Sequence, residues 1–249
     1  MTPLKLNLIL FLSAFAALSG HTQSGGEQQT LRINFSVFPL ESSNWEGILY
    51  APNGDPNQGT EELHFNPHQR TVGFSYNGPT SLRFYREVVL EEGLKGFEVV
   101  AEVSLGNRGI KGDLILFFSP VKKDQNDGPY EVSYMFDSPS SFPDDSLVFF
   151  NSMNVTFEGI LGKKRITLAP GASKPIDVSD YFDEPTPIML VLEHNDDVHR
   201  VLKNKIRFTS DRRTLYILRK PNSPNSLRIR TQRLTEYTGP RGSSDEPGA

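Results

Sequence analysis

The chain has 249 residues, 37% hydrophobic and 22% charged, so it can build a packed core and is not disordered throughout. It contains no cysteine, which excludes disulfides, thiolate chemistry and attachment through a lipidated cysteine. Its formal net charge of −4 gives no overall attraction to nucleic acid or to an anionic membrane.

The first twenty residues have the pattern of a secretory signal peptide. Lys5 supplies a positive charge, Leu6–Leu18 is mostly apolar, and Ala17–Ser19 offers the small residues that a signal peptidase requires. A membrane anchor is the alternative, but the apolar stretch is short for a transmembrane helix. We therefore expect residues 1–20 to be removed on export and residues 21–29 to form a flexible linker. The mature chain would then lie in the periplasm, at the cell surface or outside the cell, without a transmembrane segment.

Short strands separated by turn-forming residues are predicted from Leu31 onward. In Leu31–Phe38 apolar and polar residues alternate, as expected of a strand with one face in a core. Further strands are predicted at Trp45–Ala51, Glu61–Phe65, Thr71–Tyr76, Ser81–Glu87, Phe97–Leu105, Asp113–Ser119 and Tyr130–Asp137. The intervening residues are rich in Gly, Pro, Asn and Asp, which favour turns. Val88–Lys95 could form one helical turn at most.

A second group of short strands follows Asp144 and Asp145. Its members are predicted at Ser146–Asn151, Asn154–Ile160, Arg165–Leu168, Pro175–Val178, Pro187–Glu193, His199–Thr209, Arg213–Leu218 and Leu227–Gln232. Short strands at such regular spacing predict antiparallel sandwiches. The loop Leu168–Ala172 before a strand resembles immunoglobulin-like modules of bacterial envelope proteins, which implies an immunoglobulin-like fold. The predicted fold is thus all-β, with two sandwich modules, residues 30–143 and 144–235, and a disordered tail at residues 236–249.

Two segments depart from the alternation of apolar and polar residues. Leu114–Phe118 and Leu147–Phe150 are apolar at every position, as expected of strands that are covered on both faces. One face of each would belong to the core of its own module. We expect the other face to be covered by the neighbouring module, so that the modules pack tightly; an exposed aromatic patch is the alternative.

The two halves of the chain differ in charge. Residues 27–152 contain 9 Lys and Arg against 18 Asp and Glu, a net of −9, whereas residues 153–234 contain 15 against 9, a net of +6. Much of the positive charge lies on three predicted strands, which would form one basic face if they shared a sheet. Its candidate binding residues are Lys203, Lys205, Arg207, Arg228 and Arg230. An ordinary solvated face is the alternative reading of these residues.

A metal site is conceivable at one predicted hairpin. If Asp196 and Asp197 form its turn, His194 and His199 face each other across the strands, where their ring nitrogens could bind one ion. The Asn-Asp-Asp sequence is also an ordinary turn, which explains the same residues without a metal. Asn53–Asn57 places oxygen ligands at alternate positions, as calcium loops do, but turn formation explains these residues without a metal. We expect no cofactor.

Catalysis has no local signature in this sequence. Neither a phosphate-binding loop nor a nucleophile elbow is present, and the acidic pairs Glu61-Glu62 and Asp144-Asp145 lie beside turns. The sequence therefore favours an exported, non-catalytic protein that binds a protein or an acidic polysaccharide. Nucleic acid is not expected, because stacking aromatics are not interleaved with the basic residues. A hydrolase with carboxylates in a cleft and a purely structural component are the alternatives, and the oligomeric state stays open.

Overall fold

The computed structural model describes residues 30–106, 112–121, 129–223 and 225–239, whose regular secondary structure is almost entirely β strand. The predicted signal peptide and linker lie outside the described residues. Short 3₁₀ turns occur at Pro56–Gln58, Glu91–Gly93 and Ser179–Tyr181. Within the described ranges, no helix has the length and apolar character needed to cross a membrane.

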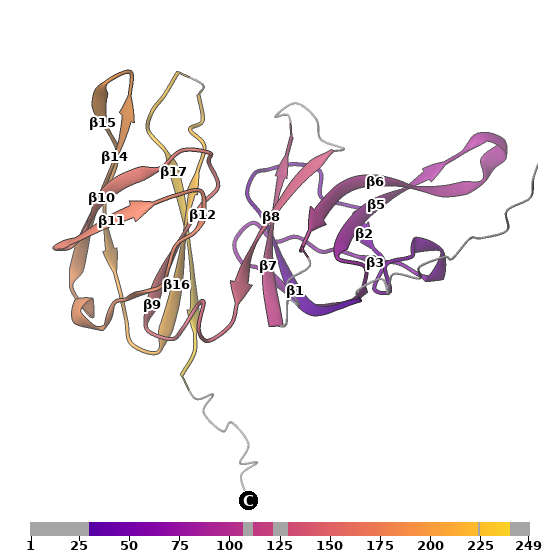
Figure 1. The fold of residues 1–249 in the computed structure, drawn as a ribbon, viewed down its shortest axis with the longest axis horizontal. Helices are drawn as coiled ribbons and strands as arrows, with labels where there is room; N and C mark the ends of the chain where they lie inside the picture. The colour runs from indigo at the N-terminus through magenta and orange to yellow at the C-terminus, as the bar shows by residue number, and fades with distance from the viewer. Residues whose placement is uncertain (1–29, 107–111, 122–128, 224, 240–249) are drawn as a thin grey trace, which may run out of the picture.

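Two four-stranded sheets form the first half of the molecule (Figure 1). Sheet A has the order β4(Thr71–Gly78), β1(Leu31–Pro39), β7(Gly112–Pro120), β8(Tyr130–Asp137). Sheet B has the order β3(Glu61–Glu62), β2(Leu49–Tyr50), β5(Ser81–Val89), β6(Lys95–Ser104). The alternation in β1 behaves as predicted: Leu31, Ile33, Phe35 and Val37 are buried in the core that the two sheets enclose.

Two further sheets form the second half. Sheet C has the order β12(Gly171–Ala172), β9(Ser146–Asn151), β16(Arg212–Arg219), β17(Arg230–Tyr237), and β13(Ile176–Asp177) also pairs with β9. Sheet D has the order β11(Lys164–Leu168), β10(Phe157–Leu161), β14(Pro185–His194), β15(Asp197–Arg207). Apolar residues from both sheets, among them Phe149, Phe157 and Leu190, form a second core.

Both halves have the same strand topology. If the strands of each half are numbered from one to eight, with β12 and β13 together as the fourth, one sheet has the order 4-1-7-8 and the other 3-2-5-6. The first and seventh strands run parallel in both halves, β1 with β7 and β9 with β16. The prediction of purely antiparallel sandwiches is therefore wrong at these pairs. The immunoglobulin-like order is not confirmed, because there the first two strands share a sheet, whereas here they lie in different sheets.

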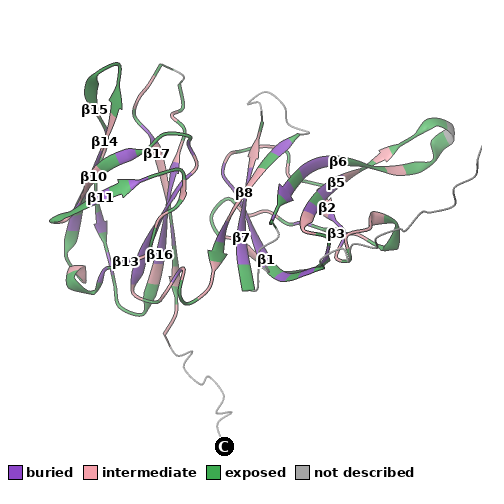
Figure 2. Cartoon of the chain, viewed as in Figure 1, coloured by how far each residue is buried: buried purple, intermediate pink, exposed green. Residues whose placement is uncertain are grey.

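A third apolar cluster joins the halves where sheet A faces sheet C. The aromatic rings of Phe117 and Phe150 stack across this interface with their centroids 3.9 Å apart. The remaining members are Phe38, Leu40, Ile115, Met135, Phe142, Val148, Leu215, Ile217 and Leu234. Leu114–Phe118 and Leu147–Phe150 are buried at every position (Figure 2), as their apolar sequences predicted. Four layers result, in the order B, A, C, D (Figure 1).

The strands of sheets A and C stack in reversed order. The stacking of Phe117 on Phe150 shows that β7 lies over β9, and β8 lies against β12. At the other edge, Arg70, which immediately precedes β4, contacts Glu236 on β17. The first strand of one half thus faces the seventh strand of the other half, and the fourth faces the eighth. This is the arrangement of an isologous interface in a two-fold dimer. The internal repeat, not detectable in the sequence, is visible in this arrangement.

Several predicted strands have different bounds in the structure. Of Trp45–Ala51 only Leu49–Tyr50 is a strand, because the Trp45 ring packs against the rings of Phe65 and Tyr130 instead of following a pleat. The strand predicted at Leu227–Gln232 is β17, which begins at Arg230 and ends at Tyr237. The tail predicted from residue 236 therefore starts too early; residues 240–249 lie outside the described part of the chain.

Candidate functional site

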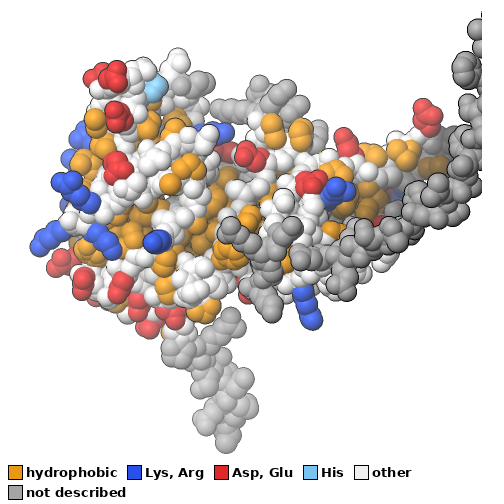
Figure 3. Space-filling view, viewed as in Figure 1, with side chains coloured by type: hydrophobic (Ala, Val, Ile, Leu, Met, Phe, Trp, Pro, Cys, Tyr) orange, Lys and Arg blue, Asp and Glu red, His pale blue; other side chains and the backbone are white. Residues whose placement is uncertain are grey.

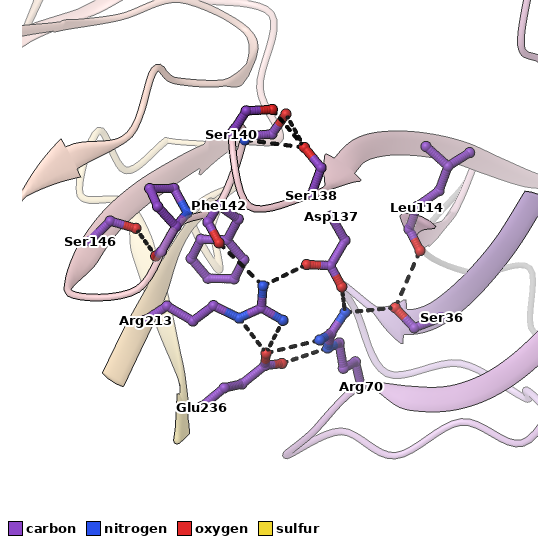
Figure 4. Close-up of polar contacts among 12 residues, drawn as sticks. Ser36, Arg70, Leu114, Asp137, Ser138, Ser140, Phe142, Ser146, Arg213 and Glu236 are labelled. Carbon is purple, nitrogen blue, oxygen red and sulfur yellow. Dashed lines mark hydrogen bonds and ion pairs between the residues drawn. The ribbon is translucent and has the colours of Figure 1, made fainter. Parts of the chain in front are cut away.

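A cluster of four charged residues lies beside the apolar interface between the halves (Figure 4). Arg70 and Asp137 come from the first half, and Arg213 on β16 and Glu236 on β17 come from the second. The Glu236 carboxylate accepts from both guanidinium groups, at 2.9 Å from Nη2 of Arg70 and 2.7 Å from Nη2 of Arg213. The Arg213 guanidinium also lies over the ring of Phe142. Because opposite charges alternate within it, the cluster needs no ligand to balance its charge.

The electrostatics of Arg70 agree with a structural role. Burial disfavours its charged form, but the carboxylates of Glu236 and Asp137 outweigh this effect and raise the pKa of Arg70 above its ordinary value. The residue is therefore held in its charged form. We conclude that the ion pairs of this cluster hold the two halves together.

A second charge cluster crosses the interface at another point. Glu41 of the first half pairs with Arg219 at 3.4 Å and also with Arg230. Burial is the main cause that lowers the pKa of Arg219, with Arg230 acting in the same direction and Glu41 opposing it. Arg230, which the sequence assigned to a basic binding face, is thus engaged between the two halves. Sequence periodicity could not reveal this, because Glu41 lies far away in the chain.

The adjacent acidic pairs are used by local structure. Glu61 accepts a hydrogen bond from the hydroxyl of Tyr50 at 2.8 Å, and Glu62 accepts one from the backbone N–H of Gly47 at 2.9 Å. Asp145 lies in the connection between the halves with a φ of 51°, so it serves a turn. Hydrogen bonds thus give the carboxylates of Glu61 and Glu62 a structural role, whereas Oδ1 of Asp145 is buried without a hydrogen-bond partner among the described residues.

The histidine hairpin is shifted by one residue from its predicted form. Its turn residues are Asn195 and Asp196, with φ values of 53° and 64°, so His194 faces Asp197 and His199 faces Leu192. The centroids of the two imidazole rings are 6.3 Å apart. No group of three or more His, Cys, Asp or Glu residues that could hold a metal ion is found among the described residues. Among the residues that the structure describes, the histidine pair therefore has no third protein ligand.

The predicted basic residues are divided between two sheets. Lys203, Lys205 and Arg207 lie exposed on β15 in sheet D, as the alternation with buried Ile206 predicted. Arg228 precedes β17 and Arg230 begins it, in sheet C. The prediction of one basic sheet is thus wrong, because β15 pairs with β14, whereas β16 and β17 pair with each other.

Sheet D nevertheless presents a cationic surface of its own. Its outer face has an apolar centre formed by Ile160, Met189 and Val191, with cations on the two flanking strands. We call this surface the cationic face; its charged residues are Arg165 on β11 and Arg200, Lys203 and Lys205 on β15. Figure 3 shows Lys and Arg side chains along the left edge of the molecule, over sheet D.

The register of sheet D explains how this surface arises. Ile160 pairs with Arg165 on one side and with Met189 on the other, and Met189 pairs with Lys203. One row across the sheet therefore reads cation, apolar, apolar, cation. Of the residues described, none lies within ion-pair distance of the three cations Arg165, Lys203 and Lys205. Two carboxylates share this face: Glu158, which accepts a hydrogen bond from Thr167, and exposed Glu193, which alternates with Met189 and Val191 on β14.

Two clefts lie where the two halves meet. One, of about 340 Å³, is lined by Glu41, Glu131 and Lys220 together with Ser119 and Ser133. The other, of about 670 Å³, is lined by Arg70, Arg213 and Glu236 of the first charge cluster. A further cleft, of about 500 Å³, lies beside β11 in the second half and is lined by residues that include Lys164, Thr167 and Lys174. No known protein-family model and no curated protein matches this sequence. The choice among these surfaces therefore rests on geometry and charge.

Proposed function

We propose that this chain is an exported, non-catalytic binding protein of the cell envelope or the extracellular space, and that its cationic face binds an acidic protein or an acidic polysaccharide. The observation that carries this proposal is the row Arg165, Ile160, Met189, Lys203 on a sheet whose opposite side is fixed by the core. The charged residues at Arg70 and at Glu41 are already engaged in ion pairs between the two halves.

The physical properties of this face suit a polyanion or an acidic protein surface. Like charges on one sheet face repel each other, a cost of some tenths of a kcal/mol for each close pair. A bound anion removes this cost, and the apolar centre supplies contact area that does not depend on charge. Binding of this kind associates rapidly and weakens as salt screens the charges.

The test is retention of the chain lacking residues 1–20 on immobilised polygalacturonate and on an acidic protein, at low and at high ionic strength. The expected result is retention at low salt that Lys203→Glu with Lys205→Glu abolishes. The control is Arg32→Glu with Lys220→Glu, which makes the same charge change at exposed positions away from sheet D. Equal loss in both double variants, or no retention of the wild type, would refute the proposal.

Export is part of the same proposal and has its own measurement. The material recovered outside the cytoplasm should begin between residues 17 and 24, within or just after the predicted cleavage region. N-terminal sequencing measures this directly. Exported protein that still begins with Met1 would contradict a cleaved signal peptide.

A further inference from the structure

A hairpin arm projects from the end of the molecule that is opposite sheet D (Figure 1). It is formed by β5 and β6, whose register continues to Val89 opposite Lys95. The neighbouring strand β2 reaches only Phe84 and Tyr85. Beyond Tyr85, in the part of the chain that the structure describes, the two strands of the arm pair only with each other.

The arm exposes large apolar side chains. Val89 is 77% exposed and Leu94 is 63% exposed, and Leu90, Phe97 and Val99 are also exposed (Figure 2). Tyr85, Phe97 and Val89 lie on one face of the hairpin, since residues at alternate positions of a strand share a face. Contiguous exposed apolar groups on a projecting element indicate a surface for another macromolecule.

The charge of the arm is opposite to that of the cationic face. Between residues 87 and 98 the sequence contains four Glu and one Lys, a net charge of −3. Lys95 is paired with Glu87, which leaves Glu91 exposed at the tip. Glu98 is also exposed, but it follows Phe97 in β6 and so lies on the opposite face of the arm. The arm therefore combines apolar and acidic side chains, and the cationic face combines apolar and basic ones.

The two surfaces also agree in size. Strands in a sheet are about 4.8 Å apart, so three spacings place the cations of β11 and β15 about 14 Å from each other. A two-stranded arm is about 5 Å wide between its strands, and sheets pack face to face at about 10 Å. The arm can thus lie over β10 and β14 through the face that carries Val89 and Phe97, with Glu91 at its tip near the flanking cations.

We propose that the hairpin arm of one copy of this chain binds the cationic face of a second copy. The proposal rests on the proposed function and names the acidic protein that the face binds. Because the arm and sheet D lie at opposite ends of the molecule (Figure 1), the contact forms between different copies. It is a heterologous contact, which leaves one free arm and one free face after each addition, so the assembly is an open chain.

Sedimentation velocity of the chain lacking residues 1–20, from micromolar to millimolar concentration, tests this assembly. The expected result is a series of elongated species that grow with concentration and shrink at high ionic strength. Val89→Ser with Leu94→Ser removes the arm contact, and Lys203→Glu with Lys205→Glu removes the face contact. Each double variant should raise the apparent Kd about tenfold or more and stay monomeric where the wild type assembles. All four side chains are exposed, so the fold is not at risk.

Mixing the two double variants is the decisive step. The Val89→Ser, Leu94→Ser variant keeps an intact cationic face, and the Lys203→Glu, Lys205→Glu variant keeps an intact arm. The two can therefore bind each other once, so a heterologous contact predicts a one-to-one dimer and no larger species. Glu91→Lys should in turn strengthen association with the Lys203→Glu, Lys205→Glu variant, because it reverses the charge at the tip of the arm as well. A wild type that is monomeric throughout, or variants that assemble like the wild type, would overturn the inference.

This outcome is separable from failure of the proposed function. The wild type could be monomeric and still bind polygalacturonate or an acidic protein through Lys203 and Lys205. That result would refute the second copy as the partner but support the cationic face as a binding site. A wild type that neither assembles nor is retained removes both proposals.

Discussion

Replacing Phe157 with alanine tests whether the two halves of the chain unfold as one unit. Phe157 on β10 is fully buried in the core of the second half. The single tryptophan, Trp45, packs in the first half, with ring centroids 5.0 Å from Phe65 and from Tyr130. Tryptophan fluorescence therefore reports on the first half, whereas the substitution weakens the second. If the halves unfold together, the fluorescence transition must move with the substitution.

The expected shift is large enough to measure. A buried Phe→Ala substitution costs about 3–5 kcal/mol, against a total stability of about 5–15 kcal/mol for a globular domain. For a chain of this size, each kcal/mol lowers Tm by about 2–4 °C, which gives a decrease of about 6–20 °C. Circular dichroism, which averages over both halves, should show the same midpoint as Trp45 fluorescence.

A second variant weakens the interface itself. Phe150→Ala removes the ring that stacks on Phe117 across the two sheets, so it lowers both the stability and the coupling between the halves. Its fluorescence and circular dichroism midpoints should separate. The reasoning fails if Phe157→Ala leaves the Trp45 transition unchanged while circular dichroism becomes biphasic, because the halves would then unfold independently.

Three more measurements concern the charge cluster, a crowded glycine and a buried tyrosine. Glu236→Gln, which removes the carboxylate shared by two arginines, should cost about 2–3 kcal/mol in chemical denaturation; no loss would mean that the cluster is not stabilising. Gly159→Ala places a Cβ 2.2 Å from the carbonyl oxygen of Met189 and should lower stability by about 1–3 kcal/mol, which thermal unfolding would detect. Burial raises the pKa of Tyr76 from 10.0 to about 12, so its stabilising effect is complete below pH 10 and is lost as the pH rises through 12. Absorbance titration checks this, and full ionisation of all tyrosines at pH 10 in folded protein would contradict it.

Local patterns in the sequence correctly predicted which faces of individual strands are buried. Alternation placed Leu31, Ile33 and Phe35 in a core, and the unbroken apolar run Leu147–Phe150 indicated a strand that is covered on both sides. Both conclusions need only the period of a strand and the cost of exposing apolar surface. The structure agrees with them for that reason.

Pairing between distant strands could not be predicted in the same way. The alternation of Lys203 and Lys205 with Ile206 fixes which side of β15 is exposed, but it does not say which strand lies next to β15. The basic face was therefore assembled from strands that belong to different sheets. The partners that matter, Arg165 and Met189, join Lys203 only through the register of sheet D. Similarly, no local pattern links Glu41 to Arg230.

The shared topology of the two halves gives a reason for their different outer surfaces. A dimer of identical modules joined through sheets equivalent to A and C would be closed, because its two-fold axis makes both outer ends the same. Joining two modules in one chain removes this constraint, so the ends can differ. Here one end carries the acidic arm of β5 and β6, and the equivalent hairpin of β14 and β15 at the other end belongs to the cationic face. The charged residues around Arg70 and Glu41 are paired with one another inside the interface, so the exposed opposite charges at the two ends are the ones that can act between molecules.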